Sequence, residues 1–293
     1  MPDATARFQA ARPMLLGLAY RLLGSRADAE DAVQDTFLRW QASDSAGIDN
    51  AEAWLTTVCT RRCLDLLQAA DRARVDYIGT WLPEPVPTDA DDDPAQATAL
   101  AASLTTAFLL ALQRLTPRER AAYLLHEIFD RPYAEVAATL ALQETACRQL
   151  VSRARGHVAN ARVRHAPPKA RQQQLLDAFR HAIATGSTTR LAGLLSADVR
   201  LSADGGGKVV AARRVMQGLA EVRRFIEAGL HVWWSPHTLV EATPNGQPGF
   251  VLRDGGTVTA TLVFAWDAEG RVQDLFIMRN PDKLAGLAGP RMQ

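Results

Sequence analysis

Apolar side chains recur every three or four positions through the first 164 residues, which is the period of an amphipathic helix. The pattern breaks between Trp81 and Ala97, where four prolines and five acidic residues stand without a lysine or arginine. Because proline lacks the amide hydrogen that helices and strands use, neither element persists there. The sequence therefore predicts two all-helical domains joined by a flexible linker.

The pattern changes after a second break at 165–171, where adjacent prolines end the preceding helix. Two helical stretches, Gln172–Thr185 and Arg213–Ala228, come first. Alternating runs rich in Val, Thr, Phe and Trp follow, separated by turn signals: His231–Glu241, Thr257–Trp266 and Val272–Met278. This order is typical of an α+β domain with a curved antiparallel sheet.

The two breaks give a multidomain chain. We expect a helical bundle at 1–78, an acidic Pro-rich linker at 79–97, a second helical domain at 98–164 and the α+β domain at 171–293. The net charge of +1 hides a strong asymmetry between these parts. Residues 1–98 carry 16 acidic and 9 basic side chains, whereas residues 99–171 carry 5 and 11. A basic middle domain favours a polyanion as its partner.

The middle domain has the spacing of a helix-turn-helix. Thr116, Pro117 and Glu119 predict a capped helix start, a second short helix begins near Pro132, and a tight turn at 141–143 leads into a third helix. One face of that third helix carries groups that can bond base edges: Thr145, Arg148, Gln149 and Ser152. Arg153 and Arg155 suit phosphates. The alternative is an amphipathic helix whose arginines only meet water.

In the first domain, the segment ADAEDAVQDTFLRW at 27–40 places Asp28, Asp31 and Asp35 on one side of a helix. An acidic face favours a basic partner, although a solvated surface is the simpler alternative. Read with Ala53-Trp54-Leu55, LTPRER at 115–120 and SRAR at 152–155, this pattern resembles the extracytoplasmic function (ECF) sigma factors of bacterial RNA polymerase.

The resemblance spans residues 8–164 and implies a role for each helical domain. The first is then sigma region 2, whose acidic helix, including Phe37, docks on the β′ coiled coil of core RNA polymerase. The middle domain is region 4, which reads the minus-35 element of promoter DNA and contacts the β flap. The residues that the resemblance assigns to the minus-10 element are Asp49, Asn50, Trp54, Thr57, Arg61 and Arg62. For Trp54, an anchor in the hydrophobic core is the alternative. Cys147 and Gln149 stand where other members often have valine and serine, so the promoter sequence stays open.

Three short motifs resemble a narrower subgroup with a fused SnoaL-like cone domain: WLPEP at 81–85, DGGGK at 204–208 and NPDKL at 280–284. By that resemblance they form an interdomain regulatory set, consisting of Trp81, Leu82, Pro83, Asp204, Gly205, Gly206, Gly207, Lys208, Asn280, Pro281, Asp282, Lys283 and Leu284. Without it, DGGGK would be a hairpin turn and NPDKL a strand terminator.

Cone folds also include isomerases and hydrolases, so catalysis is a rival hypothesis. The polar candidates do not form a recognisable constellation: Asp198, His231, His237, Asp254 and Asp267. The residues that either line a cavity or fill the core are Trp233, Trp234, Phe264 and Trp266. We therefore expect no enzyme activity, with a small ligand inside the cone left open.

The three cysteines, Cys59, Cys63 and Cys147, lack a paired framework, which indicates a reducing compartment and hence the cytoplasm. No nearby Cys or His completes a metal-ligand set with Cys59 and Cys63, so buried thiols are favoured and neither metal nor cofactor is expected. The run at 14–23 is too short to span a membrane and contains Arg21.

The sequence thus predicts a monomeric sigma factor that binds core RNA polymerase and promoter DNA and is modulated by its own C-terminal domain. Two alternatives remain open at this point. One is a ligand-sensing DNA-binding regulator that does not join polymerase, and the other is a cone-fold isomerase or hydrolase fused to a DNA-binding module.

Overall fold

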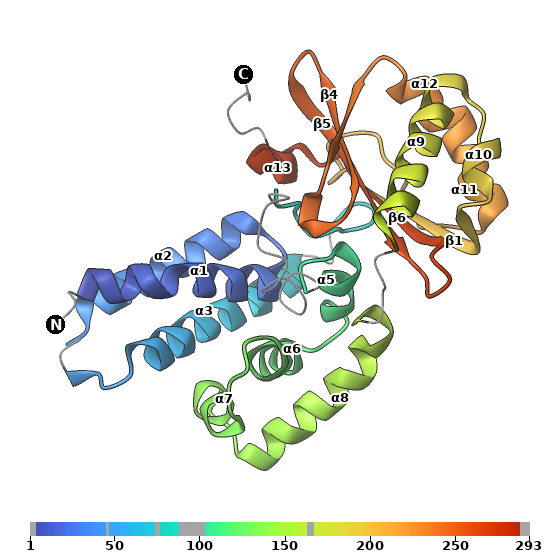
Figure 1. Ribbon diagram of the computed structural model, residues 1–293. Coiled ribbons are helices and arrows are strands. Elements are labelled where there is room, and N and C mark those ends of the chain that lie inside the picture. The colour runs from blue at the N-terminus through green and yellow to red at the C-terminus, as the bar shows by residue number, and fades with distance from the viewer. Residues whose placement is uncertain (1–3, 45–46, 74–76, 88–102, 163–166, 288–293) are drawn as a thin grey trace. The chain divides into compact units, whose positions relative to one another are not determined.

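The computed structural model describes residues 4–44, 47–73, 77–87, 103–162 and 167–287 (Figure 1). The chain divides into two compact units. The first combines Met1–Asp76 with Phe108–Asn160, and the second combines Tyr77–Ala107 with Ala161–Gln293. The segment that connects the two helical domains therefore belongs to the unit of the C-terminal domain.

Three helices begin the first unit: α1 (Ala4–Leu23), α2 (Arg26–Ala42) and α3 (Ala51–Ala73). Ser25 caps α2 by accepting a hydrogen bond from the backbone N–H of Asp28 at 3.2 Å, as serine often does at a helix start. Their apolar stripes meet in a core in which Trp40 and the thiols of Cys59 and Cys63 are buried. The Trp40 indole N–H donates to the carbonyl of Ala4 at 2.8 Å.

The predicted helix-turn-helix is confirmed in the same unit. A short helix α5 (Thr106–Leu112) precedes α6 (Pro117–Tyr123), which starts with a capping box formed by Thr116 and Glu119. After α6 the chain continues in a π-helical turn, η3 (Leu124–Ile128), and then forms α7 (Tyr133–Leu140) and α8 (Glu144–Arg162). Ala141 takes a left-handed conformation with φ of 53° and ends α7, which makes the tight turn.

Two arginine side chains tie this helix-turn-helix to the three-helix bundle. The fully enclosed guanidinium of Arg120 donates to the carbonyl of Leu22, at the end of α1, at 2.6 Å. Arg131 pairs with Glu52 at the start of α3. The two helical domains thus pack together as one body.

The second unit contains a six-stranded sheet with the strand order β2-β1-β6-β5-β4-β3. The strands are β1 (Leu195–Asp204), β2 (Met216–Gln217), β3 (Thr238–Ala242), β4 (Gly249–Asp254), β5 (Thr257–Trp266) and β6 (Val272–Met278). Neighbouring strands are antiparallel except β1 and β6, which are parallel. The expected antiparallel sheet is therefore a mixed sheet, in which β1 and β6 form the one parallel pair among the described strands. Parallel neighbours need a long crossover, and the chain between β1 and β6 supplies it through helices and a meander of three strands.

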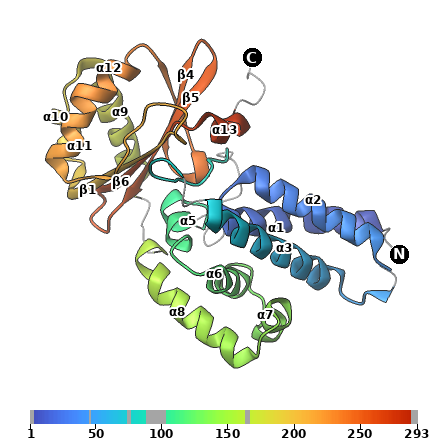
Figure 2. The same ribbon diagram turned by 180° about the vertical axis from the view of Figure 1, so that it is seen from behind.

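Helices α9 (Lys169–Thr185), α10 (Thr189–Ala192) and α11 (Leu219–Phe225) cover one face of this sheet (Figure 2). After α11 come the π-helical η4 (Ile226–Leu230) and α12 (His231–Trp234). The prediction of a strand at 231–241 is thus wrong for its first half, which forms α12. Trp234 of this helix packs into the core under the helices instead of continuing a strand. The expected helix 213–228 begins only at Leu219. Three short pieces complete the unit: η5 (Pro244–Gly246), α13 (Pro281–Leu284) and η6 (Ala285–Leu287).

Aromatic rings fill the space between the helices and the sheet. Phe179 lies 5.6 Å from Phe264, 5.8 Å from Phe250 and 6.3 Å from Trp234, measured between ring centroids. Trp266 is buried in the same cluster, whereas Trp233 is 46% exposed. Core filling is therefore the correct interpretation for three of the four aromatic candidates and wrong for Trp233.

The opposite face of the sheet is also covered. Val263 and Phe276, whose neighbours in sequence point toward the helices, are buried on this face. Leu82, Pro83 and Pro85 of the linker lie against it. Strands that are buried on both faces carry nearly continuous apolar runs, as TLVFAW in β5 and LFIM in β6 do.

Candidate nucleic-acid interface and linker clamp

Helix α8 presents the polar face that the sequence predicts for DNA. The four positions expected to face base edges are all exposed: Thr145, Arg148, Gln149 and Ser152. The opposite stripe of Cys147, Val151 and Ala154 is completely buried. Helix α8 is therefore anchored along one side and open along the other, as a recognition helix must be.

Three arginines of α8 have carboxylate partners within the first unit. Arg153 pairs with Glu119 at 2.9 Å, Arg155 with Glu127 at 2.6 Å and Arg148 with Glu144 at 3.3 Å. The hydrogen bond from Arg155 to Glu127 raises the pKa of Arg155 above its ordinary value. A DNA phosphate would have to compete with these carboxylates, although the arginines themselves are more than half exposed.

The residues expected at the minus-10 element lie on α3 and just before it. Asp49 and Asn50 are exposed, and the Asn50 side chain caps α3 by accepting from the Ala53 N–H at 3.0 Å. Trp54 is half-buried with its ring centroid 5.3 Å from that of Trp40. The packing of Trp54 therefore matches the core-anchor alternative in part.

Two of these residues are bound by the helix-turn-helix. The Thr57 hydroxyl lies 3.0 Å from that of Thr139 in α7. The Arg61 guanidinium donates to the carbonyls of Thr139 at 3.0 Å and Ala138 at 3.1 Å. Arg62 instead pairs with Asp35 at 2.6 Å. In this arrangement the polar groups of Thr57 and Arg61 are taken up by the end of α7.

The acidic face of α2 has the exposure expected of a docking surface at two of its positions. Asp28 and Asp31 are exposed, whereas Asp35 is held by its ion pair with Arg62. Phe37 packs on Phe8 at 4.7 Å between ring centroids and is half-buried. Leu38, seven residues after Asp31 and thus on the same helix face, is 55% exposed. The sequence pattern does not single out Leu38, because it follows Phe37 directly and lies two residues before Trp40, and both of these belong to the apolar side of the helix.

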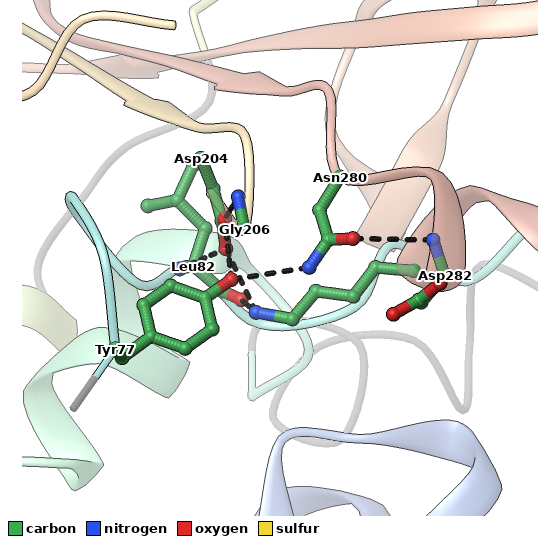
Figure 3. A network of polar contacts seen from close by, with 7 residues as sticks. Tyr77, Leu82, Asp204, Gly206, Asn280 and Asp282 are labelled. Carbon is green, nitrogen blue, oxygen red and sulfur yellow. Dashed lines mark hydrogen bonds and ion pairs between the residues drawn. The ribbon is translucent and has the colours of Figure 1, made fainter. Parts of the chain in front are cut away.

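The three motifs WLPEP, DGGGK and NPDKL come together around the carboxylate of Asp204 (Figure 3). This carboxylate has no exposed surface. It accepts hydrogen bonds from the Tyr77 hydroxyl at 2.5 Å, the Leu82 N–H at 2.9 Å and the Lys283 ammonium at 2.7 Å. A buried charge needs such partners. The Gly206 N–H is a fourth donor at 2.9 Å, and two of the four donors, Tyr77 and Leu82, belong to the segment that follows the first helical domain. We call this set, completed by Asn280, the linker clamp.

Lys283 and Asn280 strengthen the linker clamp from the C-terminal side. Lys283 also donates to the Leu82 carbonyl at 2.7 Å, and its ammonium lies 4.4 Å from the centre of the Trp81 ring. Asn280 donates to the Tyr77 hydroxyl at 3.1 Å. Burial, together with the hydrogen bond to Asp204, raises the pKa of Tyr77 well above its ordinary value. The linker around 77–82 is thus bound by side chains of the C-terminal domain.

A second attachment, which the sequence analysis missed, lies further along the linker. Asn245 exchanges two hydrogen bonds with the backbone of Val86 and donates to the Leu104 carbonyl at 3.1 Å. The Gln247 side chain accepts from the Thr106 N–H at 2.8 Å. The Pro-Asn-Gly turn signal at 244–246 gave no hint of this role, because a turn asparagine usually bonds its own backbone. Residues 79–87 of the expected flexible linker are therefore attached to the C-terminal domain, and residues 88–97 lie outside the described part of the chain.

The glycines of DGGGK are required by close approach as well as by turn geometry. Gly206 has φ of 60°, and a Cβ there would lie 2.4 Å from the Asn280 side-chain nitrogen. At Gly207, with φ of 71°, a Cβ would lie 3.1 Å from Ile78 of the linker. Lys208 forms an exposed ion pair with Asp282 at 2.5 Å. The motif thus forms a turn that packs on Asn280 and Ile78, although the loop from 205 to 215 between β1 and β2 is too long for a tight hairpin. The regulatory role that the resemblance implies stays a prediction.

Several of the polar candidates for catalysis have structural partners of their own. Asp198 bonds Ser196, Asp267 accepts from backbone N–H groups of the turn before β6, and Asp254 is the exposed last residue of β4. The His231 ring nitrogen donates to the Ile183 carbonyl at 2.6 Å, so it is a satisfied structural histidine. Among the described residues no group of three or more His, Cys, Asp or Glu could hold a metal ion.

A cavity of about 350 Å³ opens beside the DGGGK loop and is lined by Ile78, Lys208 and Val209, among others. It is separate from the interior of the domain, which the aromatic rings fill. None of the helices in the described ranges is long and apolar enough to cross a membrane.

Comparisons with known proteins agree with this architecture. Residues 7–73 match the family model of sigma-70 region 2, and residues 105–158 match that of sigma-70, region 4. The chain is 38% identical over 292 residues to the ECF RNA polymerase sigma factor SigJ of Mycobacterium tuberculosis, covering 96% of this chain and 93% of SigJ. It is 31% identical over 285 residues to the probable ECF RNA polymerase sigma factor SigI of the same species, covering 96% and 94%.

The crystal structure of M. tuberculosis SigJ superimposes with a TM-score of 0.74 at 37% identity, over 96% of this chain and 98% of SigJ. A region 2 bundle and a region 4 helix-turn-helix in one chain define a sigma factor. This protein belongs to the family of ECF RNA polymerase sigma factors. Its relatives are transcription initiation factors and not enzymes, and the catalytic alternative is set aside.

Proposed function

We propose that this sigma factor joins core RNA polymerase in the cytoplasm, contacts promoter DNA through α3 and α8, and is controlled in cis by its C-terminal domain. The acidic surface of α2, extended by Leu38, is the proposed docking surface for the β′ coiled coil, with the β flap contacted by the helix-turn-helix. These roles follow from family membership and from the charge and exposure of the residues concerned.

The observation that carries the control in cis is the linker clamp. Tyr77 and Leu82 lie just after region 2 in sequence and are bound by Asp204, which is fully buried. Leu104 and Thr106 lie just before the helices of region 4 and are bound by Asn245 and Gln247. Both ends of the connection between the two promoter-binding domains are therefore attached to the C-terminal domain, one at the end of β1 and the other at the η5 turn.

This attachment limits how far the two helical domains can separate. A free linker of this length would let them sample many separations, whereas attachment at both ends restricts them. The bonds from α7 to Thr57 and Arg61 fit a resting arrangement, because these groups must be released before they can contact DNA. We infer that opening the linker clamp is a step in activation.

Transcription by purified core RNA polymerase tests this proposal. The variant with Asp204→Ala and Lys283→Ala opens the linker clamp, and Asn245→Ala with Gln247→Ala opens the second attachment. We expect both to change promoter-specific initiation in the same direction while binding of core polymerase stays within about twofold of wild type. The matched control is Lys208→Ala with Asp282→Ala, which removes only the exposed ion pair nearby.

Unchanged initiation in both double variants would remove the proposed control in cis. The ligand-sensing regulator that never joins polymerase is tested in the same assay, since it predicts no transcription above that of core polymerase alone.

A further inference from the structure

Tyr133, the first residue of α7, lies against the guanidinium of Arg148 in α8. The Arg148 carbon Cζ is 4.3 Å from the centre of the tyrosine ring. The imidazole of His126, in η3, is stacked on the same ring at 3.9 Å between centroids and 29° between planes. Two groups this close to one ring cannot share a face, so Tyr133 lies between His126 and Arg148.

A hydrogen bond to the backbone fixes the position of His126 in this stack. His126 donates from Nδ1 to the carbonyl of Arg131, at the start of the same turn, at 2.9 Å. Tyr133 and His126 are half-buried, whereas Arg148 is exposed. The body of the domain thus sets the position of the ring, and the guanidinium is the most exposed group of the three.

This geometry suits an arginine that reads a base. A cation on an aromatic ring is held through the face of its plane, which leaves the N–H donors at the edge of the guanidinium free. Bidentate contact with the O6 and N7 atoms of guanine uses those edge donors. An arginine that contacts nothing in the free protein would lose much rotamer freedom on binding DNA. Because Arg148 is already restricted by stacking on Tyr133, the entropic cost of binding is smaller. Glu144 steadies one amino group at 3.3 Å.

We propose that Tyr133 is a specificity-determining positioning residue, which holds the guanidinium of Arg148 for contact with a guanine in the upstream promoter element. The inference rests on the proposed function of α8. It assigns part of the discrimination between promoter bases to Tyr133, a residue outside that helix. Three elements, η3, α7 and α8, then contribute to one base contact.

The test uses holoenzyme assembled from the full-length chain and core RNA polymerase. It is presented with promoter fragments that are randomised over the upstream element, and the enrichment of each base at each position is measured. We expect wild type to enrich guanine at one position and Arg148→Ala to abolish that preference. Tyr133→Leu should lower it about 2- to 5-fold at the same position only, which is the worth of an exposed cation–π contact.

Three further variants separate positioning from other roles. Tyr133→Phe keeps the ring and should behave as wild type. The double variant of Tyr133→Leu with Arg148→Ala should lose no more than Arg148→Ala alone, because both remove one interaction. Arg155→Ala, which removes a cation suited to phosphate, should weaken retention of all fragments alike.

Several results would overturn the inference. A uniform loss for all fragments in Tyr133→Leu would mean a structural role, and an equal loss in Tyr133→Phe would mean that the hydroxyl contacts DNA. An unchanged preference in Tyr133→Leu, with Arg148→Ala still effective, refutes the role of Tyr133 alone. If Arg148→Ala also leaves the preference unchanged, the proposed function of α8 fails as well. Should the leucine variant not assemble with polymerase, Tyr133→Gln, which keeps a polar surface group without a ring, is expected to show the same loss.

Discussion

Asp204 shows at the scale of one residue how a buried carboxylate joins distant parts of the chain. Its partners come from the linker, from its own loop and from α13. Because the charge is fully buried, its stability depends on all of them together. An ion pair of this kind contributes little beyond an apolar pair of the same shape, but it is costly to break on one side.

We therefore expect Asp204→Ala to lower the free energy of unfolding of the second unit by about 3–5 kcal/mol, since Lys283 would be left without its buried partner. Native-state hydrogen exchange of the amides in β5 and β6 measures this change. Asp282→Ala is the control, because its ion pair with Lys208 is exposed and should matter by less than about 1 kcal/mol. Equal losses in the two variants would contradict the special role of Asp204.

The pKa of Tyr77 gives the linker clamp a pH dependence with a defined sign. Burial and the hydrogen bond to Asp204 raise this pKa in the folded state. The stabilisation is therefore fully present below the ordinary tyrosine pKa of about 10, and it is lost as the pH rises through the raised value. The stability difference between wild type and Tyr77→Phe should be constant from about pH 6 to 9 and shrink only above about 10. Hydrogen exchange or urea unfolding at several pH values checks this, and a difference that changes near pH 7 would contradict it.

Residue identity alone predicted much of the candidate site and missed specific parts. The exposed polar face of α8 follows from the helical period, so the exposure of Thr145 and Arg148 could be predicted in advance, whereas their contact with DNA stays a prediction. Asn245 and Gln247 could not, because their partners are backbone groups 141 to 159 residues away and backbone partners leave no mark in a sequence. Phe37 is less exposed than Leu38 because it packs on Phe8 of α1. This contact between two helices cannot be predicted from the helical period of α2 alone.

At the scale of elements, the turn between α7 and α8 depends on an unusual residue. Ala141 has φ of 53°, a conformation that costs a residue with a Cβ about 1–2 kcal/mol relative to glycine. Ala141→Gly should therefore raise the free energy of unfolding of the first unit by up to about 1 kcal/mol.

Ala134→Gly provides the matched comparison, because Ala134 is exposed and lies in the first turn of α7, where the backbone is already helical. There glycine should lower stability by up to about 1 kcal/mol. Urea unfolding of both variants, followed by circular dichroism, tests the opposite signs. A loss in both variants would mean that the turn is held by contacts other than its backbone conformation.

The elements that the sequence predicted correctly are those with a strong local pattern. The capping box at Thr116 and Glu119, and the apolar stripe of α8, specify helices by themselves. Strand β1, with the sequence LSADVRLSAD, was not predicted, since serine and aspartate are poor strand formers and burial between β2 and β6 decides the outcome. The parallel pairing of β1 with β6 is likewise set by the crossover and not by either strand.

At the scale of the whole molecule, opposite charges are carried by separate domains. The acidic residues of the first domain and the arginines of α8 give the chain one surface for a basic partner and another for a polyanion. A total charge near zero therefore says nothing about either interface. Only the position of a charge should matter for the docking of core RNA polymerase.

Two variants with the same change in net charge test this point. Asp28→Arg with Asp31→Arg reverses the exposed acidic positions of α2, and Asp254→Arg with Glu269→Arg reverses exposed acids of the C-terminal domain. We expect the first to weaken binding of core RNA polymerase roughly tenfold or more, because like charges brought together in an interface cost several kcal/mol. The second should bind as wild type, as measured by competition for core polymerase against labelled wild-type chain.

If both variants lose affinity equally, attraction by total charge would explain the result and α2 would not be the docking surface. Raising the salt concentration then separates the two explanations further, since long-range attraction is screened beyond about 10 Å at 0.1 M salt, whereas a direct clash of arginines in the interface persists.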